Sequence, residues 1–440
     1  MPQKLAKLLF HTLFVAIIFS LHSCKTEQKQ LKTLFKNSAI VNDHLTGFAL
    51  YDMDSRQMLY SLNASKYFTP ASNTKLLTFY TSLKMLGDSV PALKYQTRGD
   101  SLFFWGTGDP SFLERDLKGT NAIEFLKQQH KKLFYCTGTY QNKPFGNGWA
   151  WDDYNDYYQS EISGLPIESN LINISVDQAG HLQTEPAYFK KYLKLDSNYH
   201  PVGFKMQRNY INNMLVYPAI NAPIGFKQTI PWQTNDEITK ELLQDTLKQP
   251  IQLLKRQMPT DAKTIYDAPA DSVYRKMLLT SDNFIAEQLL LVCSSIKYGY
   301  LNSDSVRQYA LKNYLADLPD KPQWADGSGL SRLDLMTPRA MIALLNKIAD
   351  LIGDDKRMHN LLPAGGVSGT LKFAYKTDNG EPFVWAKTGS LSNNYNQSGY
   401  IITRKKRRLA FCFMNNNFTS SSKTVRDEME RIITYIHEKY

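Results

Sequence analysis

Residues 68–75 read Phe68-Thr69-Pro70-Ala71-Ser72-Asn73-Thr74-Lys75. Apolar side chains recur at helical spacing from there to Leu86, so the pattern predicts a helix that begins near Ser72. Residues three apart share one face of a helix, which would place the Lys75 amine beside the Ser72 hydroxyl. A desolvated lysine can act as a base, and a helix N-terminus favours a developing oxyanion. The segment therefore predicts an activated serine nucleophile.

Two further motifs follow along the chain. Ser281-Asp282-Asn283 stands at the start of an expected helix, and the unique Lys387-Thr388-Gly389 lies on an expected strand. Each short pattern alone is weak. Chance copies of Ser-x-x-Lys occur at 294–297 and 420–423, and copies of Ser-x-Asn at 61–63 and 392–394. The stronger signal is the order of the three motifs and the elements on which they are expected to lie.

The periodicity of the chain predicts helices and strands on both sides of a long insertion. The expected strands are 47–52, 58–62, 384–389, 397–403 and 409–415, and the expected helices are 72–86, 272–276, 283–292 and 423–440. Residues 96–265 are rich in Tyr, Asn, Gln and Lys, with short alternating runs such as 170–176. We therefore expect an α/β fold in which a catalytic domain, 24–95 with 266–440, holds an antiparallel sheet flanked by helices. Residues 96–265 would form a mostly β inserted region.

The composition excludes several classes of protein. The 440 residues carry 52 basic and 41 acidic side chains, a net charge of +11. This surplus suits an anionic polymer or surface, but no nucleic-acid recognition motif accompanies it. The basic run 404–408 is interpreted as a hairpin turn. The four cysteines lack metal-ligand spacing, and the motifs of zinc proteases, α/β-hydrolases, P-loop enzymes and dinucleotide enzymes are absent. We expect no metal, no cofactor and no nucleic-acid partner.

The first residues are typical of an export signal. Lys4 and Lys7 precede a mostly apolar run over residues 8–21, which is too short for a comfortable membrane span. The run ends in Leu21-His22-Ser23-Cys24, which is similar to a bacterial lipobox. We predict a lipoprotein-type signal peptide over 1–23, a lipidated Cys24, and a periplasmic protein anchored to a membrane of a Gram-negative bacterium. The alternatives are ordinary secretion or a retained anchor with an unmodified Cys24.

The three ordered motifs resemble those of the serine acyl-transferases of the penicillin-binding protein and β-lactamase superfamily. Five segments limit the resemblance to one family within this superfamily. They are 68–75, 106–110, 148–153, 326–332 and 366–371. Together they are similar to the D-alanyl-D-alanine carboxypeptidase/endopeptidase family, the class C low-molecular-mass penicillin-binding proteins (PBP4-type, peptidase family S13). The likeness runs from about residue 45 to 437. The long insertion between the first two motifs is a hallmark of that family.

The resemblance implies a role for each catalytic residue. Ser72 would be the nucleophile that forms the acyl-enzyme, with Lys75 as its general base. Ser281 would pass the proton to the leaving amine, tuned by Lys387. Asn283 would hold both the substrate amide and Lys75.

The resemblance also implies how substrate is bound. Lys387 and Thr388 would bind the terminal carboxylate of the peptide through charge-assisted hydrogen bonds. The backbone N–H groups of Ser72 and Ser390 would form the oxyanion hole. Gly389 would leave the strand bare, so that the substrate backbone can approach closely.

A second group of residues would recognise the third residue of the peptide. By the family pattern these are Asp153, Tyr158 and Arg332. An aspartate with an arginine would suit meso-diaminopimelate, which carries an amino group and a carboxylate. Alternatively, Asp153 caps a turn and Arg332 forms a surface ion pair. The pair Trp149 and Trp151 could stack on a sugar, although an ordinary domain core is favoured for both.

The function expected from this resemblance is cleavage of D-Ala-D-Ala or D-Ala-diaminopimelate bonds in peptidoglycan stem peptides and cross-links. Carboxypeptidase and endopeptidase are not separable, because one site does both. Penicillins and other β-lactams would acylate Ser72 and inhibit the enzyme. The alternatives are a β-lactamase, a penicillin sensor or cell-wall-binding lipoprotein without turnover, and a basic lipoprotein that binds glycan or nucleic acid.

Overall fold

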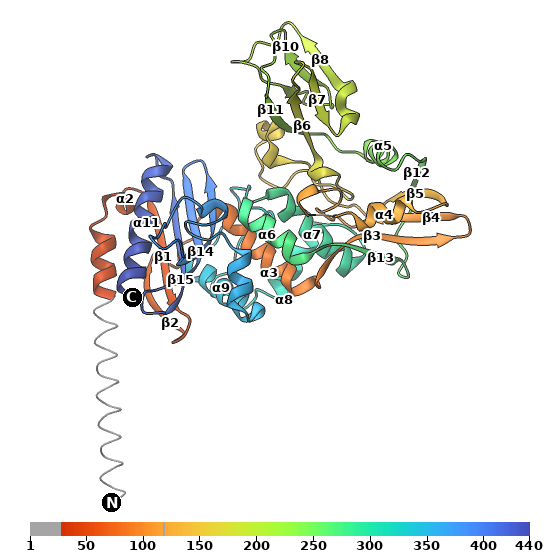
Figure 1. The fold of residues 1–440 in the computed structure, drawn as a ribbon. Coiled ribbons are helices and arrows are strands. Elements are labelled where there is room, and N and C mark those ends of the chain that lie inside the picture. The colour runs from red at the N-terminus through yellow and green to blue at the C-terminus, as the bar shows by residue number, and fades with distance from the viewer. Residues whose placement is uncertain (1–27, 118) are drawn as a thin grey trace, which may run out of the picture. The chain divides into compact units, whose positions relative to one another are not determined.

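The computed structural model describes residues 28–117 and 119–440, which divide into two compact units (Figure 1). The first unit holds the described residues up to Asn73, with Leu318–Gln323 and Leu335–Tyr440. The second holds Thr74–Asp317 and Trp324–Asp334. The predicted signal peptide and Cys24 lie outside the described residues. None of the helices among the described residues combines the length and apolar character that a membrane crossing requires.

The first unit is built on a five-stranded antiparallel sheet. Its strands are β1 (Leu45–Asp52), β2 (Gln57–Leu62), β14 (Val384–Leu391), β15 (Asn394–Ile402) and β16 (Arg408–Asn416), in the order β14-β15-β16-β1-β2. Its helices cover 28–36, α2 (Ala39–Asn42), α9 (Pro338–Ile352), α10 (Asp355–Leu361) and α11 (Ser422–Lys439), with 3₁₀ turns η1 (Ala71–Thr74) and η7 (Gly369–Leu371). Because β1 pairs with β16, strands from residues 45–52 and 408–416, far apart in the chain, lie side by side in one sheet.

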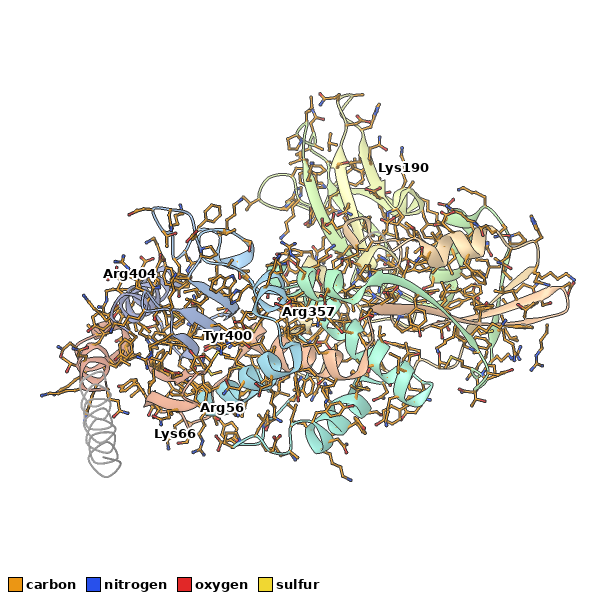
Figure 2. All side chains as sticks on the ribbon, turned by 60° about the horizontal axis from the view of Figure 1, so that its bottom comes forward. Arg56, Lys66, Lys190, Arg357, Tyr400 and Arg404 are labelled. Carbon is orange, nitrogen blue, oxygen red and sulfur yellow. The ribbon has the colours of Figure 1, made fainter. Side chains whose placement is uncertain are left out.

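The sheet of the first unit is stabilised by helices that begin and end with local signals. On β16, Phe411 and Phe413 share a buried core with residues of α11 such as Ile433. Helix α9 begins at Pro338 after the Thr337 side chain caps it, and such a cap contributes about 1 kcal/mol. Tyr400 of β15, labelled in Figure 2, donates to the carbonyl of Leu345 in α9 over 2.8 Å.

The basic run 404–408 lies at the turn between β15 and β16, as predicted (Arg404 is labelled in Figure 2). Arg407 forms an ion pair of 2.7 Å with Asp52, and Arg408 forms one of 2.6 Å with Asp54. Part of this charge therefore joins the hairpin to the end of β1.

The second unit combines a helical layer with three sheets. Its helices are α3 (Lys75–Met85), α4 (Asn121–Lys127), α5 (Asp236–Leu247), α6 (Ala270–Thr280), α7 (Asn283–Tyr298) and α8 (Ser303–Asn313). Strands β3 (Ser89–Arg98), β4 (Ser101–Gly106), β5 (Lys132–Thr137), β12 (Ile251–Lys255) and β13 (Lys263–Pro269) form a mixed sheet in the order β12-β5-β4-β3-β13. Strands β6 (Leu171–Val176), β7 (Leu182–Glu185) and β11 (Lys227–Pro231) form a second sheet, and β8 (Leu193–Asp196), β9 (Gln207–Arg208) and β10 (Leu215–Pro218) a third. Short 3₁₀ turns are η2 (Arg115–Leu117), η3 (Trp151–Asn155), η4 (Tyr157–Gln159), η5 (Glu168–Asn170) and η6 (Ala187–Tyr192).

Helix α7 is the buried axis of the helical layer. Residues 284–295 are all buried, so this part of α7 is surrounded on every side. The Asp282 side chain caps its start by accepting from the Ile285 N–H over 2.9 Å, and Gly299 ends it in the left-handed conformation. This cap fixes where the Ser281-Asp282-Asn283 motif lies.

The architecture confirms the expected α/β fold with an antiparallel sheet flanked by helices and a mostly β insertion. The boundaries predicted at 95/96 and 265/266 stay a prediction. Strands β3 and β13 each run across one of those boundaries and pair with each other, and β3 also pairs with β4 from the insertion.

Candidate active site

The serine of the first motif follows a strained residue. Ser72 lies in η1 and is half-buried, and α3 begins at Lys75, so the chain passes directly from one helical segment into the other. Ala71 is fully buried and has φ of 48°, a left-handed conformation that costs an L-residue on the order of 1–3 kcal/mol. Next to it, Asn73 Nδ2 donates to Ser398 Oγ of β15 over 3.1 Å. Surrounding packing thus holds Ser72 in one backbone geometry.

Lys75 is fully buried in the second unit and hydrogen-bonded to two residues far along the chain. Its Nζ donates to Asn283 Oδ1 over 2.6 Å and to the Ser328 carbonyl over 2.7 Å. Burial lowers the pKa of Lys75 to about 8, because desolvation disfavours the ammonium form. Four nearby carboxylates oppose this shift, those of Asp326, Asp282, Glu287 and Asp334. The amine is therefore much closer to neutrality near pH 7 than an exposed lysine.

A carboxylate organises the loop that presents the Ser328 carbonyl. Asp326 accepts from the Gly329 N–H over 2.6 Å and from the Ser331 N–H over 2.7 Å. Glu287 of α7 accepts from the Ser328 N–H over 2.8 Å. Burial raises the pKa of Glu287 to about 7, and the nearby Asp326 adds to this effect. These two acids hold the peptide group of Ser328 so that its carbonyl accepts from Lys75.

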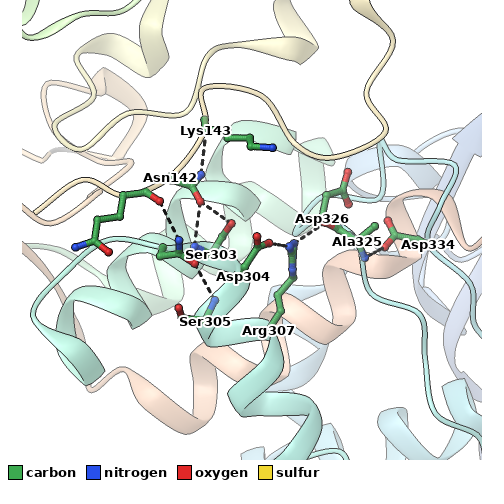
Figure 3. Close-up of polar contacts among 11 residues, drawn as sticks. Asn142, Lys143, Ser303, Asp304, Ser305, Arg307, Ala325, Asp326 and Asp334 are labelled. Carbon is green, nitrogen blue, oxygen red and sulfur yellow. Dashed lines mark hydrogen bonds and ion pairs between the residues drawn. The ribbon is translucent and has the colours of Figure 1, made fainter.

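Helix α8 also contacts the loop that presents the Ser328 carbonyl (Figure 3). Arg307 donates from Nη1 to the Ala325 carbonyl over 2.5 Å and also pairs with Asp304. Asp334 Oδ1 accepts from the Ala325 N–H over 2.6 Å. The guanidinium of Arg307 and the carboxylate of Asp334 thus fix the start of the loop that holds the Ser328 carbonyl.

The second motif lies in a tight turn between α6 and α7. Ser281 has φ of 60° and ends α6, while Asp282 caps α7 and Asn283 begins it. Asn283 uses both ends of its amide, since Oδ1 accepts from Lys75 and Nδ2 donates to the Tyr158 carbonyl over 2.9 Å. Asn283 therefore joins Lys75 to the segment that holds the predicted third-residue pocket.

The predicted specificity residues lie on two loops that pack together. Asp153 and Tyr158 are half-buried on the segment of η3 and η4, while Arg332 is exposed. Burial raises the pKa of Asp153, against a hydrogen bond from Tyr158 that lowers it. The two loops are joined by Trp149, whose Nε1 donates to Asp326 Oδ2 over 2.8 Å.

The expectation that Trp151 belongs to a domain core is wrong. Its side chain is 73% exposed, because it stands at the first residue of η3, a turn with no buried residue, and points away from the protein interior. The neighbouring Trp149 is partly buried beside the Ile162 and Leu291 cluster. The two tryptophans therefore have different surroundings despite their spacing of two residues.

The third motif lies on β14 in the first unit. Lys387 is fully buried and its Nζ donates to the Thr388 carbonyl over 2.7 Å. Thr388 Oγ1 donates to Thr370 Oγ1 over 2.8 Å. Strand β14 is an edge strand of its sheet, and the segment 363–365 pairs with it along residues 384–386. An edge strand is a place where an extended peptide can add as a further strand.

Gly389 lies against the backbone of the nucleophile segment, so any side chain there would collide with it. An added Cβ would be 2.5 Å from the Pro70 carbonyl oxygen and 3.0 Å from the amide nitrogens of Ser72 and Asn73. Contacts below 3.0 Å to backbone force the backbone to move. The conformation of the Ser72 N–H therefore depends on the absence of a side chain at residue 389.

We predict that Gly389→Ala lowers the rate of acylation by benzylpenicillin about 100-fold, because it displaces a backbone donor that would bind the oxyanion. The measurement is the rate of adduct formation by intact mass. Gly87→Ala is the matched control, since a Cβ there has nothing within 4 Å. Equal rates for Gly389→Ala and the wild type would show that this contact does not shape the oxyanion hole.

Sequence reasoning assigned no part in the active site to Glu287 or Thr370, and gave Ser328 only a structural role in a Gly-rich turn near the site. Glu287 was detectable, because it lies four residues after Asn283 on the same helix face. Thr370 belongs to a segment noted only for its resemblance. The role of the Ser328 carbonyl could not be predicted from the sequence, because every residue type has a backbone carbonyl.

The fold and the three motifs define a class, the serine acyl-transferases with the penicillin-binding protein fold. Within this class, residues 27–436 match the model of the D-Ala-D-Ala carboxypeptidase 3 (S13) family. The match covers nearly the whole chain, and the protein belongs to this family. The predicted family, fold class and enzyme class, a D-Ala-D-Ala carboxypeptidase of the serine type, are thereby confirmed.

Comparison with individual proteins agrees with this family assignment. The chain is 26% identical to the D-alanyl-D-alanine carboxypeptidase DacB of Haemophilus influenzae, over 86% of this chain and 88% of that protein. It is 24% identical to the penicillin-sensitive carboxypeptidase A of Dictyostelium discoideum, over 85% and 83%. Among solved structures, penicillin binding protein 4 (dacB) from Haemophilus influenzae has a TM-score of 0.72 at 22% identity, over 92% of this chain and 98% of that one. This last likeness establishes the fold.

Proposed function

We propose that this protein hydrolyses the D-Ala-D-Ala bond of peptidoglycan stem peptides and the D-Ala-diaminopimelate bond of cross-links through an acyl-enzyme on Ser72. The observation that carries the proposal is Lys75, a fully buried lysine three residues from that serine whose pKa is lowered to about 8. A general base works best when its pKa lies near the operating pH. Two fixed acceptors direct the Lys75 amine, so that its lone pair is available for the Ser72 proton.

Acylation begins when neutral Lys75 takes the proton of the Ser72 hydroxyl. Ser72 Oγ then attacks the carbonyl carbon of the penultimate D-Ala, and the oxyanion accepts from the N–H groups of Ser72 and Ser390. The C–N bond breaks as Ser281 relays the proton from Lys75 to the leaving amine, which is free D-Ala or the amino group of diaminopimelate. Water then cleaves the ester and restores the serine.

Binding of substrate would use the edge strand β14 and the charge of Lys387. An extended peptide end can pair with the backbone beyond Ala386, while Lys387 and Thr388 bind its terminal carboxylate. A charge-assisted hydrogen bond of this kind contributes roughly 1.5–3 kcal/mol. The Asn283 amide would hold the peptide group next to the scissile bond.

The test of the function is digestion of a D-Ala-D-Ala pentapeptide and of a cross-linked muropeptide, followed by mass spectrometry. We expect loss of one D-Ala from the first and separation of the two stems of the second, both blocked by prior acylation with benzylpenicillin. A lasting penicillin adduct without any peptide cleavage would instead indicate a sensor. Rapid penicillin hydrolysis without a lasting adduct would indicate a β-lactamase.

We predict that Arg332→Ala weakens cleavage of diaminopimelate stems about tenfold more than cleavage of stems with an uncharged third residue. The reason is the loss of one charge-assisted hydrogen bond to the diaminopimelate carboxylate. The measurement is kcat/KM on the two substrates. An equal decrease on both would make Arg332 a structural residue of the loop.

We also propose that the protein is exported and attached to a membrane through a lipid on Cys24. The support is the residue pattern that ends in Leu21-His22-Ser23-Cys24 and the peptidoglycan substrate, which lies outside the cytoplasm. Fractionation of cells with wild-type protein and Cys24→Ser tests the anchor. Membrane-bound wild type and released variant are expected. Equal distribution of the two would reject lipidation.

A further inference from the structure

Two exposed aromatic side chains, Trp151 and Tyr210, form a platform on the second unit together with the half-buried Tyr154. The Trp151 ring lies 6.2 Å from the Tyr210 ring, and Tyr154 lies 5.0 Å from Tyr210, both in edge-to-face geometry. Trp151 is 73% exposed and Tyr210 is 57% exposed. A cluster of large apolar side chains in water marks an interaction surface more often than a single exposed residue does.

The platform is rigid, as a binding surface needs to be. The Tyr154 hydroxyl accepts from Gln207 over 2.9 Å, and its ring lies 5.2 Å from the guanidinium of Arg208. Arg208 is itself fully buried and donates to the Pro231 carbonyl over 2.9 Å. Asn155 exchanges two hydrogen bonds with the Arg208 backbone, of 2.8 and 3.3 Å. The rings are therefore presented by fixed backbone and not by a loose loop.

The platform is continuous with the predicted third-residue pocket. Trp151 precedes Asp153 by two residues in η3, so their Cα atoms lie within about 8 Å of each other. In peptidoglycan, the sugar that carries the stem is joined to the third stem residue by a chain of two residues and a short linker, which spans roughly 10 Å when extended. A stem with its third residue at Asp153 would bring its sugar to the distance at which these rings lie.

We infer that Trp151, Tyr154 and Tyr210 bind the glycan strand of peptidoglycan, as a sugar subsite beside the peptide pocket. The C–H faces of a pyranose ring carry weak positive charge and pack on the negative faces of aromatic rings. The exposed Asp152 carboxylate beside Trp151 can accept hydrogen bonds from sugar hydroxyl or acetamido N–H groups. This inference rests on the proposed function, since the stem peptide connects the two subsites. It predicts that substrates attached to glycan are preferred over free stem peptides.

The experiment compares two substrates with the same pentapeptide, one free and one attached to its disaccharide. Trp151→Ala is expected to lower kcat/KM for the disaccharide substrate about tenfold more than for the free peptide, and Tyr210→Ala is expected to act in the same direction. Tyr266→Ala is the matched control, because this tyrosine is 54% exposed on β13, outside the platform. It should change neither value.

The possible outcomes distinguish failure of the sugar subsite from failure of the proposed function. A wild-type protein that cleaves neither substrate would reject the proposed function. If the wild type cleaves both and Trp151→Ala lowers both equally, or neither, the sugar subsite is wrong.

A second measurement is independent of catalysis. Titration with a peptide-free N-acetylglucosamine tetramer should change the tryptophan fluorescence of Ser72→Ala and not that of the double variant with Trp151→Ala. Identical curves, or no binding by Ser72→Ala, would overturn the inference.

Discussion

Ser72→Ala is expected to remove all covalent reaction with benzylpenicillin, so that the intact mass of the variant stays unchanged after hours of incubation. In the proposed mechanism, the oxygen of the Ser72 hydroxyl forms the covalent bond to the penicillin. In serine peptidases, loss of the nucleophile lowers kcat by roughly 10⁶. The variant should fold normally, because it removes one oxygen from a half-buried side chain.

The matched control for this variant is Ser420→Ala. Ser420 begins a second Ser-x-x-Lys pattern, at 420–423, but it is exposed and precedes the start of α11. It should acquire the penicillin adduct at the wild-type rate. An adduct on Ser72→Ala, located by peptide mapping, would identify a different nucleophile.

Lys75→Ala is expected to slow acylation by about 10²–10⁴, the range contributed by a positioned general base. Because the variant also leaves Asn283 Oδ1 and the Ser328 carbonyl without their donor, Lys75→Met should be measured with it as a closer match in volume. Lys423→Ala is the control, since this lysine is exposed and pairs only locally with Asp427. Acylation of both Lys75 variants at the wild-type rate would show that another group accepts the Ser72 proton.

The pH dependence of acylation distinguishes a base from a merely structural lysine. With the pKa of Lys75 lowered to about 8, the neutral amine is the minor form at pH 7 and becomes the major form above pH 8. The rate should therefore rise about tenfold per pH unit below that value and level off above it. Glu287, whose pKa is raised to about 7, loses its proton over part of the same range and would favour the ammonium form. A flat profile from pH 6 to 9 would contradict the assignment of Lys75 as the base.

Much of the first unit was predictable because its elements obey local rules. The strands 47–52, 384–389 and 409–415 were predicted, and the structure extends each by two residues. The start of the helix at Asn283 was also predicted, and in the structure Asp282 caps it. The helix at 72–86 was also correct, except that its first turn is the 3₁₀ turn η1.

The insertion was less predictable for a physical reason. Its sheets contain short strands such as β9 and parallel pairs such as β8 with β10, whose partners lie far apart in sequence. Local periodicity carries little information about such pairing. Helices α4 and α5 within the insertion were also not predicted, because their apolar residues belong to a core shared with distant strands.

The amino-acid sequence alone was sufficient for the order of the motifs and for the family, because both depend on residue type and spacing along the chain. Only the tertiary structure shows that Lys75 is buried, since its two acceptors stand 208 and 253 residues away. The pKa of that amine follows from desolvation and from carboxylates that the fold collects around it, which spacing does not encode. The same holds for Trp151, whose exposure depends on which surfaces the packing of the second unit leaves uncovered.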